Sequence, residues 1–319
     1  MAELKNTFSW SFSAHEDFDE CRRRRYWSKY GKWGGWDARA SEIQRKAYML
    51  DKMDNRYSIQ GNAVESSVMW VLREKQAGRD VSVEDAYEQV ARPFLNKCWK
   101  ESKGKAWQRD AKHHCNLREH YYPEQYSQDE REWTPVVIEN TRRCIANFIE
   151  RVLPGLSHIT ADHEVEIAQP GGGGDPEHFI IEDVKIYAIP DYVYRDQGVF
   201  HIIDWKSGRP RPSHRNQVGL YGLWAHLKHE VPAEEIIVTL HYLSEGTAVI
   251  EPLSDDRLLD VQSLVGESVG DMSGYLVAED RGANKPLPRE EWDLAPSRQP
   301  CRVCNFYELC EPEFGADTD

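Results

Sequence analysis

The sequence predicts an α/β fold in which a mixed central β-sheet is flanked by helices. Short runs of alternating apolar and β-branched residues predict strands, and longer stretches with apolar residues at helical spacing predict helices. The strand pattern occurs in 161–168, 179–194, 198–206, 235–243 and 247–252. The helix pattern occurs in 61–76, 82–100, 135–153, 214–229 and 254–275.

A further helix is predicted near the N-terminus. Ser13 is followed three residues later by Glu16, a capping box that predicts a helix running to Arg25. The glycine-rich, aromatic segment 30–36 then predicts a loop. Trp33 and Trp36 could stack on nucleotide bases there, although packing in a core or against a partner is the favoured interpretation.

The middle of the chain predicts an insertion. Residues 101–134 are polar, basic and aromatic, and with the adjoining helices they suggest a helical insertion over 76–160 within a single domain, 1–319. Gly171–Gly174 predicts a flexible hairpin tip, because the Lys-Ser/Thr pair of a phosphate-binding loop is missing.

Composition limits the class of protein. The 319 residues are 40% apolar and include eleven tryptophans, which is enough for a sizeable core. No apolar run is long enough for a membrane helix, and the first residues lack the apolar centre of a signal peptide, so we expect a cytoplasmic protein without a membrane partner.

The net charge of −14 argues at first against a nucleic-acid partner. Basic residues are nevertheless concentrated locally. Segment 22–46 holds nine basic and two acidic residues, and segment 97–118 holds seven basic and two acidic residues. Such patches can bind a phosphate backbone within a negative overall field, although each could also be an ordinary solvated face.

The most informative residues end two apolar runs. Pro190-Asp191 follows Val184–Ile189, and Asp204-Trp205-Lys206 follows Val199–Ile203, with Gln197-Gly198 between the two as a turn. Residues two apart on a strand share a face, so Asp204 and Lys206 project together, and Asp191 joins them from the neighbouring strand. Carboxylates are preferred ligands of Mg²⁺, and a lysine beside them can orient or deprotonate a water for phosphodiester hydrolysis. A polar hairpin with a solvated ion pair is the alternative.

The cysteines form a second pattern. An odd count of seven, with no signal peptide, argues against a disulfide framework. Cys301-x2-Cys304-x5-Cys310 supplies three thiolates, and Cys21, beside four arginines, is the best fourth ligand. Zinc and an iron–sulphur cluster both accept four cysteines. Cys98, Cys115 and Cys144 are expected to be ordinary buried thiols, with metal binding at His113-His114-Cys115 as a minor alternative.

Together these residues resemble the PD-(D/E)XK nuclease superfamily, and further motifs resemble its RecB-like branch. Gln217-Val218-Gly219-Leu220-Tyr221 is similar to the Q-x-x-x-Y motif on the helix after the lysine strand, and the four cysteines are similar to the iron–sulphur clasp of AddB-type and CRISPR-associated exonucleases. Phe8–Ser13 is similar to the serine-rich opening of that branch. The resemblance implies a restriction-endonuclease-like core whose clasp joins the two chain ends. It also favours a 4Fe–4S cluster over zinc as the occupant of the clasp.

The resemblance implies a set of site residues. The early-helix position that carries a metal-binding histidine in this branch is Glu65 here, and an oxygen ligand suits Mg²⁺ or Mn²⁺. The implied metal ligands are Glu65, Asp191, Asp204 and the Trp205 backbone carbonyl. Lys206 positions the attacking water, and Gln217 and Tyr221 support it or contact DNA. Arg22, Arg23, Arg209, Arg211 and Arg215 are the expected DNA contacts.

The predicted function is therefore metal-dependent DNA cleavage, with exonuclease action on single-stranded or resected ends favoured by the resemblance. The setting would be repair, recombination, phage or CRISPR-related processing, with other recombination, replication or CRISPR proteins as further partners. Two alternatives remain: a non-cleaving DNA-end or partner-binding module, and a zinc-clasped protein-interaction domain.

Overall fold

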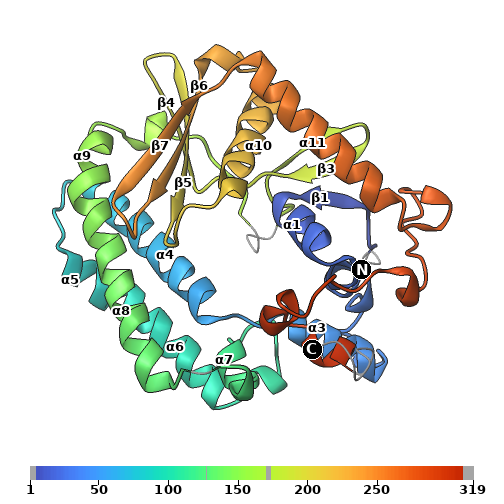
Figure 1. The fold of residues 1–319 in the computed structure, drawn as a ribbon. Coiled ribbons are helices and arrows are strands. Elements are labelled where there is room, and N and C mark those ends of the chain that lie inside the picture. Colours follow the sequence, from blue (N-terminus) through green and yellow to red (C-terminus); the bar gives the residue numbers. More distant parts are fainter. Residues whose placement is uncertain (1–4, 127, 170–173, 312–319) are drawn as a thin grey trace.

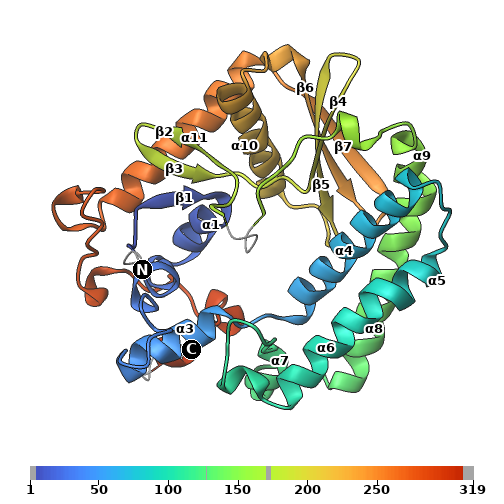
Figure 2. The same cartoon turned by 180° about the vertical axis from the view of Figure 1, so that it is seen from behind.

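A computed structural model describes residues 5–126, 128–169 and 174–311. The predicted α/β class is confirmed. A four-stranded sheet with the order β4-β5-β6-β7 lies between two groups of helices (Figures 1 and 2), and it is mixed because β5 and β6 are parallel while the outer pairs are antiparallel. Its strands are β4 (Tyr192–Asp196), β5 (Val199–Lys206), β6 (Ile236–Tyr242) and β7 (Thr247–Pro252).

A second, three-stranded sheet has the order β1-β3-β2. Its strands are β1 (Ser9–Ser11), β2 (His178–Ile181) and β3 (Val184–Tyr187). The prediction that Val184–Ile189 pairs directly with the 198–206 strand is therefore wrong. Val184–Tyr187 instead pairs parallel with β1 from the far N-terminus, a long-range contact that local sequence patterns do not encode.

The two faces of the four-stranded sheet are covered differently. Phe200 and Ile202 of β5 pack with the helices α10 and α11, whereas Ile203 and Trp205 pack with the helices α4 and α8. The bounds are α4 (Arg56–Gln76), α8 (Glu130–Asn147), α10 (Pro212–His229) and α11 (Asp255–Ser273). Alternation along one strand therefore supplies both cores.

The turn between β4 and β5 fixes the register of the hairpin. Gln197 and Gly198 both have positive φ, 49° and 84°. Two such residues form the tight turn that suits a twisted hairpin, and Gly198 adopts this conformation without steric cost. Tyr192 consequently pairs with Ile203, and Asp196 pairs with Val199, as the predicted turn requires.

Several predicted boundaries shift. The first helix is capped by Ser11, which accepts a hydrogen bond from the Ala14 amide, so the predicted cap at Ser13 is wrong. An extended residue, Cys21, then divides the predicted helix into α1 (Phe12–Glu20) and α2 (Arg22–Tyr26). Segment 161–168 forms a single bridge between Glu164 and Tyr194 rather than a strand. The predicted glycine hairpin tip lies largely outside the described residues.

The remaining helices lie in the N-terminal part of the chain, in segment 76–160 and at the C-terminal end. The predicted helices over 82–100 and 135–153 are present, each with a π-helical turn, at Tyr87–Ala91 and Phe148–Val152. The bounds are α3 (Glu42–Asp51), α5 (Val83–Ala86), α6 (Arg92–Lys103), α7 (Arg118–Tyr121), α9 (Leu153–Leu156) and α12 (Tyr307–Cys310).

Segments near the two ends of the chain lie side by side (Figures 1 and 2). The Arg23 amide donates to the Asp293 carbonyl at 2.9 Å, and the Asn284 side chain donates to the Asn6 carbonyl at 2.7 Å. Residues around 20 and 300 are therefore held in one region, as a clasp between the ends requires.

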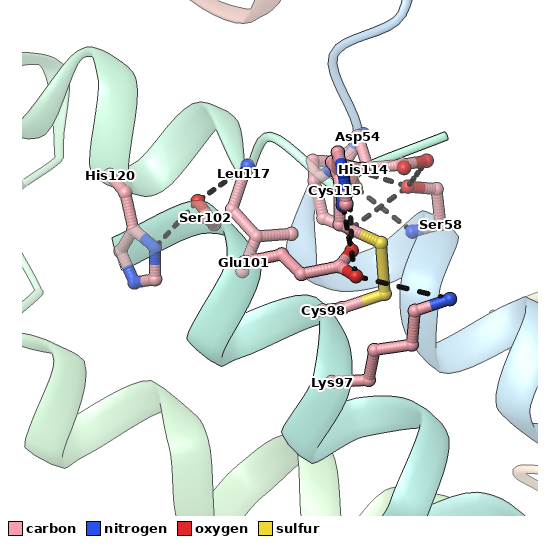
Figure 3. Close-up of a disulfide and its surroundings, with 11 residues drawn as sticks. Asp54, Ser58, Lys97, Cys98, Glu101, Ser102, His114, Cys115, Leu117 and His120 are labelled. Atoms are coloured by element: carbon pink, nitrogen blue, oxygen red, sulfur yellow. Dashed lines mark hydrogen bonds and ion pairs between the residues drawn. A yellow bond between two sulfur atoms is a disulfide. The ribbon is translucent and has the colours of Figure 1, made fainter. Parts of the chain in front are cut away.

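A disulfide joins Cys98 to Cys115 across seventeen residues, so the prediction that both are ordinary thiols is wrong (Figure 3). The pairing depends on the insertion folding back on itself. The Leu117 amide donates to the Ser102 hydroxyl at 2.8 Å, and the Cys115 amide donates to Glu101 at 3.0 Å. Cys144 is a buried free thiol, as predicted. His114 contacts Glu101, and His113 contacts Asp110.

Reduction of this disulfide should destabilise the segment around Cys98 and Cys115. Closing a loop of this size stabilises the folded state by about 3 kcal/mol in the chain-entropy account. We expect a lower melting temperature with a thiol reductant present, and the same temperature for Cys98→Ser with and without reductant. A wild-type melting temperature that does not respond to reductant would show that the bridge contributes nothing.

Candidate active site

The site lies at the end of β5, where the strand meets the start of α10. Asp204 and Lys206 lie on the face of β5 that also carries Phe200 and Ile202, the face covered by α10. The Asp204 side chain is almost fully buried. Apolar packing on that face thus fixes where the two charged residues point.

A chain of polar contacts runs from the strand to the helix. The Lys206 ammonium lies 2.7 Å from the Asp204 carboxylate and donates to the Gln217 side-chain carbonyl at 2.7 Å. The Gln217 amide donates in turn to the Tyr221 hydroxyl at 2.8 Å. Gln217 and Tyr221 are one helical turn apart, so both reach the same strand end. The lysine is held in one position by a carboxylate and an amide oxygen.

Asp191 precedes β4 and reaches across to β5. Its carboxylate accepts a hydrogen bond from the Trp205 amide at 2.7 Å. The contact ties Asp191 to the backbone between Asp204 and Lys206. Although the predicted strand pairing was wrong for 184–187, the predicted approach of Asp191 to Asp204 is what the structure shows.

Glu65 comes from the opposite side of the sheet, on α4. That helix approaches the end of β5 closely, because a Cβ atom added at Gly61 would lie 3.6 Å from the Ser207 hydroxyl. Glu65 is one turn further along α4 and is exposed, with no direct hydrogen bond or ion pair to another described residue. It interacts with Asp204 and Lys206 through their charges.

The three acids disfavour one another's ionised forms. Burial raises the pKa of Asp191 well above its usual value, and the charges of Asp204 and Glu65 raise it further. Burial also raises the pKa of Asp204 against the opposing effect of Lys206, and partial enclosure at the site, with the charge of Asp204, raises that of Glu65. Such clustered negative charge with perturbed pKa values is typical of a functional site.

The donor set suits a hard divalent cation. One ammonium faces three carboxylates, and a doubly charged ion would relieve the excess negative charge that raises their pKa values. In the described part of the chain, however, no three His, Cys, Asp or Glu side chains lie close enough together to hold an ion as they stand. The fit of the site to a cation therefore rests on the chemistry of its donors.

Comparison with protein families decides the class. The model of the PD-(D/E)XK nuclease superfamily matches residues 9–311. The chain belongs to this superfamily. Comparison with curated proteins gives no match. The superfamily assignment confirms the coarser part of the sequence prediction, and it indicates a nuclease that uses Mg²⁺ or Mn²⁺.

The four cysteines of the predicted clasp lie in one region of this nuclease-superfamily chain. Cys304 and Cys310 pack in an apolar cluster with Trp27 and Leu50. The Cys21 sulfur accepts a hydrogen bond from the Arg24 amide at 3.4 Å. Burial raises the pKa of Cys304 to about 12, with smaller contributions from Cys310 and Cys21. Among the described residues, no three of these thiols lie close enough together, as placed, to hold a metal ion.

The five arginines expected to contact DNA differ in their placement. Arg23 is buried, and its guanidinium donates to the Trp292 carbonyl at 2.8 Å, so it holds the two chain ends together rather than facing solvent. Arg22 lies over the Phe18 ring, and Arg215 pairs with Glu251 at 2.8 Å. Arg209 and Arg211 are exposed beside the site.

One residue at the site was missed from the sequence. His214 lies one turn before Gln217 on α10, and its ring contacts the Tyr242 hydroxyl at 3.3 Å. Burial, together with the charges of Lys206 and Arg211, lowers the pKa of His214 to about 4, which favours the neutral ring. Its spacing of three residues before Gln217 was the available signal.

In the part of the chain that the structure describes, no helix is both long and apolar enough to cross a membrane.

Proposed function

We propose that the protein is a metal-dependent DNA nuclease whose site is formed by Glu65, Asp191, Asp204 and Lys206. The observation that carries the proposal is the contact between Lys206 and Asp204 in a chain of this superfamily. Asp191 joins them by accepting a hydrogen bond from the backbone amide of Trp205, the residue between the two. The three carboxylates, with the Trp205 backbone carbonyl, would hold Mg²⁺ or Mn²⁺, which supplies charge stabilisation and a more acidic water.

The chain's own residues prepare the reaction. Gln217 holds the Lys206 ammonium through its side-chain oxygen, and the Tyr221 hydroxyl fixes the Gln217 amide by accepting its hydrogen bond. The Lys206 ammonium is thus held at the end of β5, where it can orient the attacking water and stabilise charge that develops on the phosphate. Exposed Arg209 and Arg211 would bind the phosphate backbone next to it.

The substrate is proposed to be single-stranded or resected DNA ends, and the context is repair, recombination, phage or CRISPR-related processing. The test is degradation of end-labelled single- and double-stranded DNA with Mg²⁺ or Mn²⁺. We expect wild-type protein to degrade the DNA, chelator to stop it and Asp204→Ala to abolish it. DNA binding without any cleavage under these conditions would instead support the non-cleaving end-binding module.

We further propose that Cys21, Cys301, Cys304 and Cys310 hold a 4Fe–4S cluster, as in the RecB-like branch. Support comes from their common location between the chain ends and from the charge interactions that link Cys21 with Cys301 and Cys304, and Cys304 with Cys310. The alternative occupant is zinc, which fits a zinc-clasped interaction domain.

Anaerobic purification distinguishes the two metals. We expect a brown protein with visible absorption, about four irons per chain for such a cluster, and loss of the colour in Cys304→Ser. Cys144→Ser is a control, because Cys144 is also a free thiol but lies outside this region. A colourless protein containing zinc would exclude the cluster.

A further inference from the structure

A hollow in the surface lies away from the site at the β5 end. It has a volume of about 610 Å³ and is lined by α3 and the adjoining loop on one side and by residues 107–113 of the insertion on the other. We name it the α3 pocket. Its volume falls within the range of about 300–1,000 Å³ that is typical of ligand sites. Nothing in the proposed catalytic chemistry uses it.

Aromatic side chains line this pocket. Trp36 is 46% exposed, yet its ring packs edge-on against Trp33 at 5.0 Å and against Tyr48 at 5.9 Å. Trp107 lines the pocket from the insertion and packs on Tyr121 at 5.5 Å. Trp36 is therefore held in place while much of its indole surface faces solvent, an arrangement suited to stacking on a flat ligand.

Cations with unused hydrogen-bonding capacity surround the aromatic residues. Within the described residues, the exposed side chains of Arg109 and Lys112 have no hydrogen-bond or ion-pair partner. Arg45 donates one hydrogen bond, to the Ala38 carbonyl.

Of the three acids that line the pocket, two are engaged, and the third, Glu42, is exposed. Asp110 is bound to the His113 ring at 2.7 Å, and Asp37 is bound to Arg39 at 3.0 Å. The pocket lies where the two basic segments, 22–46 and 97–118, meet in a chain of net charge −14. Free cations beside a fixed indole fit a polyanion that carries aromatic rings.

We propose that the α3 pocket binds single-stranded DNA, with a base stacked on Trp36 and phosphates on Arg109 and Lys112. The identity of the ligand rests on the proposed nuclease function. The position agrees with a role in holding substrate, because α3 is followed after four residues by α4, the helix that carries Glu65. A strand held here would extend the contact with DNA beyond the site of cleavage.

The test is binding of a fluorescein-labelled oligothymidylate of about twelve nucleotides, within the usual site sizes, measured by anisotropy in chelator so that no cleavage occurs. Trp36→Ala should weaken binding by about 5- to 150-fold, the effect of losing one base stack. Trp36→Phe should retain most of the affinity. Trp99→Ala is the matched control, because Trp99 is 37% exposed and lies outside the pocket.

Salt dependence tests the phosphate contacts. Arg109→Ala and Lys112→Ala should each reduce the slope of log affinity against log salt by about 0.7, the value for one phosphate contact on a single strand. Unchanged affinity in Trp36→Ala, or equal competition by thymidine monophosphate and the oligonucleotide, would overturn the proposal.

Cleavage is measured separately with metal. Trp36→Ala should raise KM with little change in kcat. If Trp36→Ala weakens DNA binding but the wild type cleaves no DNA, the nuclease proposal fails and the pocket proposal is retained. If the wild type cleaves DNA, and Trp36→Ala has the same affinity and the same cleavage rate, the pocket proposal fails and the nuclease proposal is retained.

Discussion

Replacement of Lys206 by alanine should lower the rate of DNA cleavage by about 10²- to 10⁴-fold, the usual contribution of a positioned acid–base group. The ammonium is held by Asp204 and Gln217 at 2.7 Å each, so alanine removes the only described cation in direct contact with the Asp204 carboxylate. Single-turnover cleavage with saturating Mn²⁺ measures the effect.

The control must separate chemistry from folding, because removing one partner of a buried ion pair can destabilise a protein. Lys185→Ala is matched: Lys185 also lies on a strand and pairs with a carboxylate, that of Asp175, but outside the site. Far-ultraviolet circular dichroism and melting temperature should show a folded Lys206→Ala protein. Full cleavage by that folded variant would remove Lys206 from the mechanism.

Replacement of Asp191 by asparagine should have opposite effects on stability and activity. Asparagine can still accept the hydrogen bond from the Trp205 amide, but it carries no charge. Burial and two neighbouring carboxylates disfavour the charge in the metal-free protein. We therefore expect a free energy of unfolding about 0.5–2 kcal/mol higher at neutral pH in chelator, the usual size of a single stabilising substitution, together with loss of cleavage.

The pH dependence follows from the raised pKa of Asp191. Between the ordinary and the raised value, the folded protein binds more protons than the unfolded chain, so its stability falls as pH rises through that window. The advantage of Asp191→Asn should thus disappear towards about pH 4, near the ordinary aspartate pKa.

Metal should reverse the order of stability. Because an ion that binds only the folded state stabilises it by mass action, Mn²⁺ should raise the melting temperature of the wild type more than that of Asp191→Asn. Equal shifts in the two proteins would contradict a role for Asp191 in holding the ion.

The sequence was sufficient where a local pattern determines the structure. The hairpin turn at Gln197-Gly198, the strand ending in Asp204 and Lys206, and the helix carrying Gln217 and Tyr221 all follow from alternation, turn chemistry and helical spacing. The superfamily match agrees with the interpretation drawn from those residues.

Features that depend on distant contacts were not predictable in the same way. The parallel pairing of β1 with β3 joins residues far apart in the chain, and the Cys98–Cys115 bridge requires the insertion to fold back on itself. The burial of Arg23 likewise depends on the segment around Trp292. Local periodicity contains none of this information, because each contact is chosen by tertiary packing.

Because successive residues of β5 face opposite sides of the sheet, the number of residues in the β4–β5 hairpin determines which side chains reach the site. One residue inserted between Gly198 and Phe200 would turn Asp204 and Lys206 towards α4 and bring Ile203 and Trp205 under α10. Chemistry and packing would fail together, so this short connection should resist any change in its number of residues, and a side chain at Gly198 would add backbone strain at φ 84°.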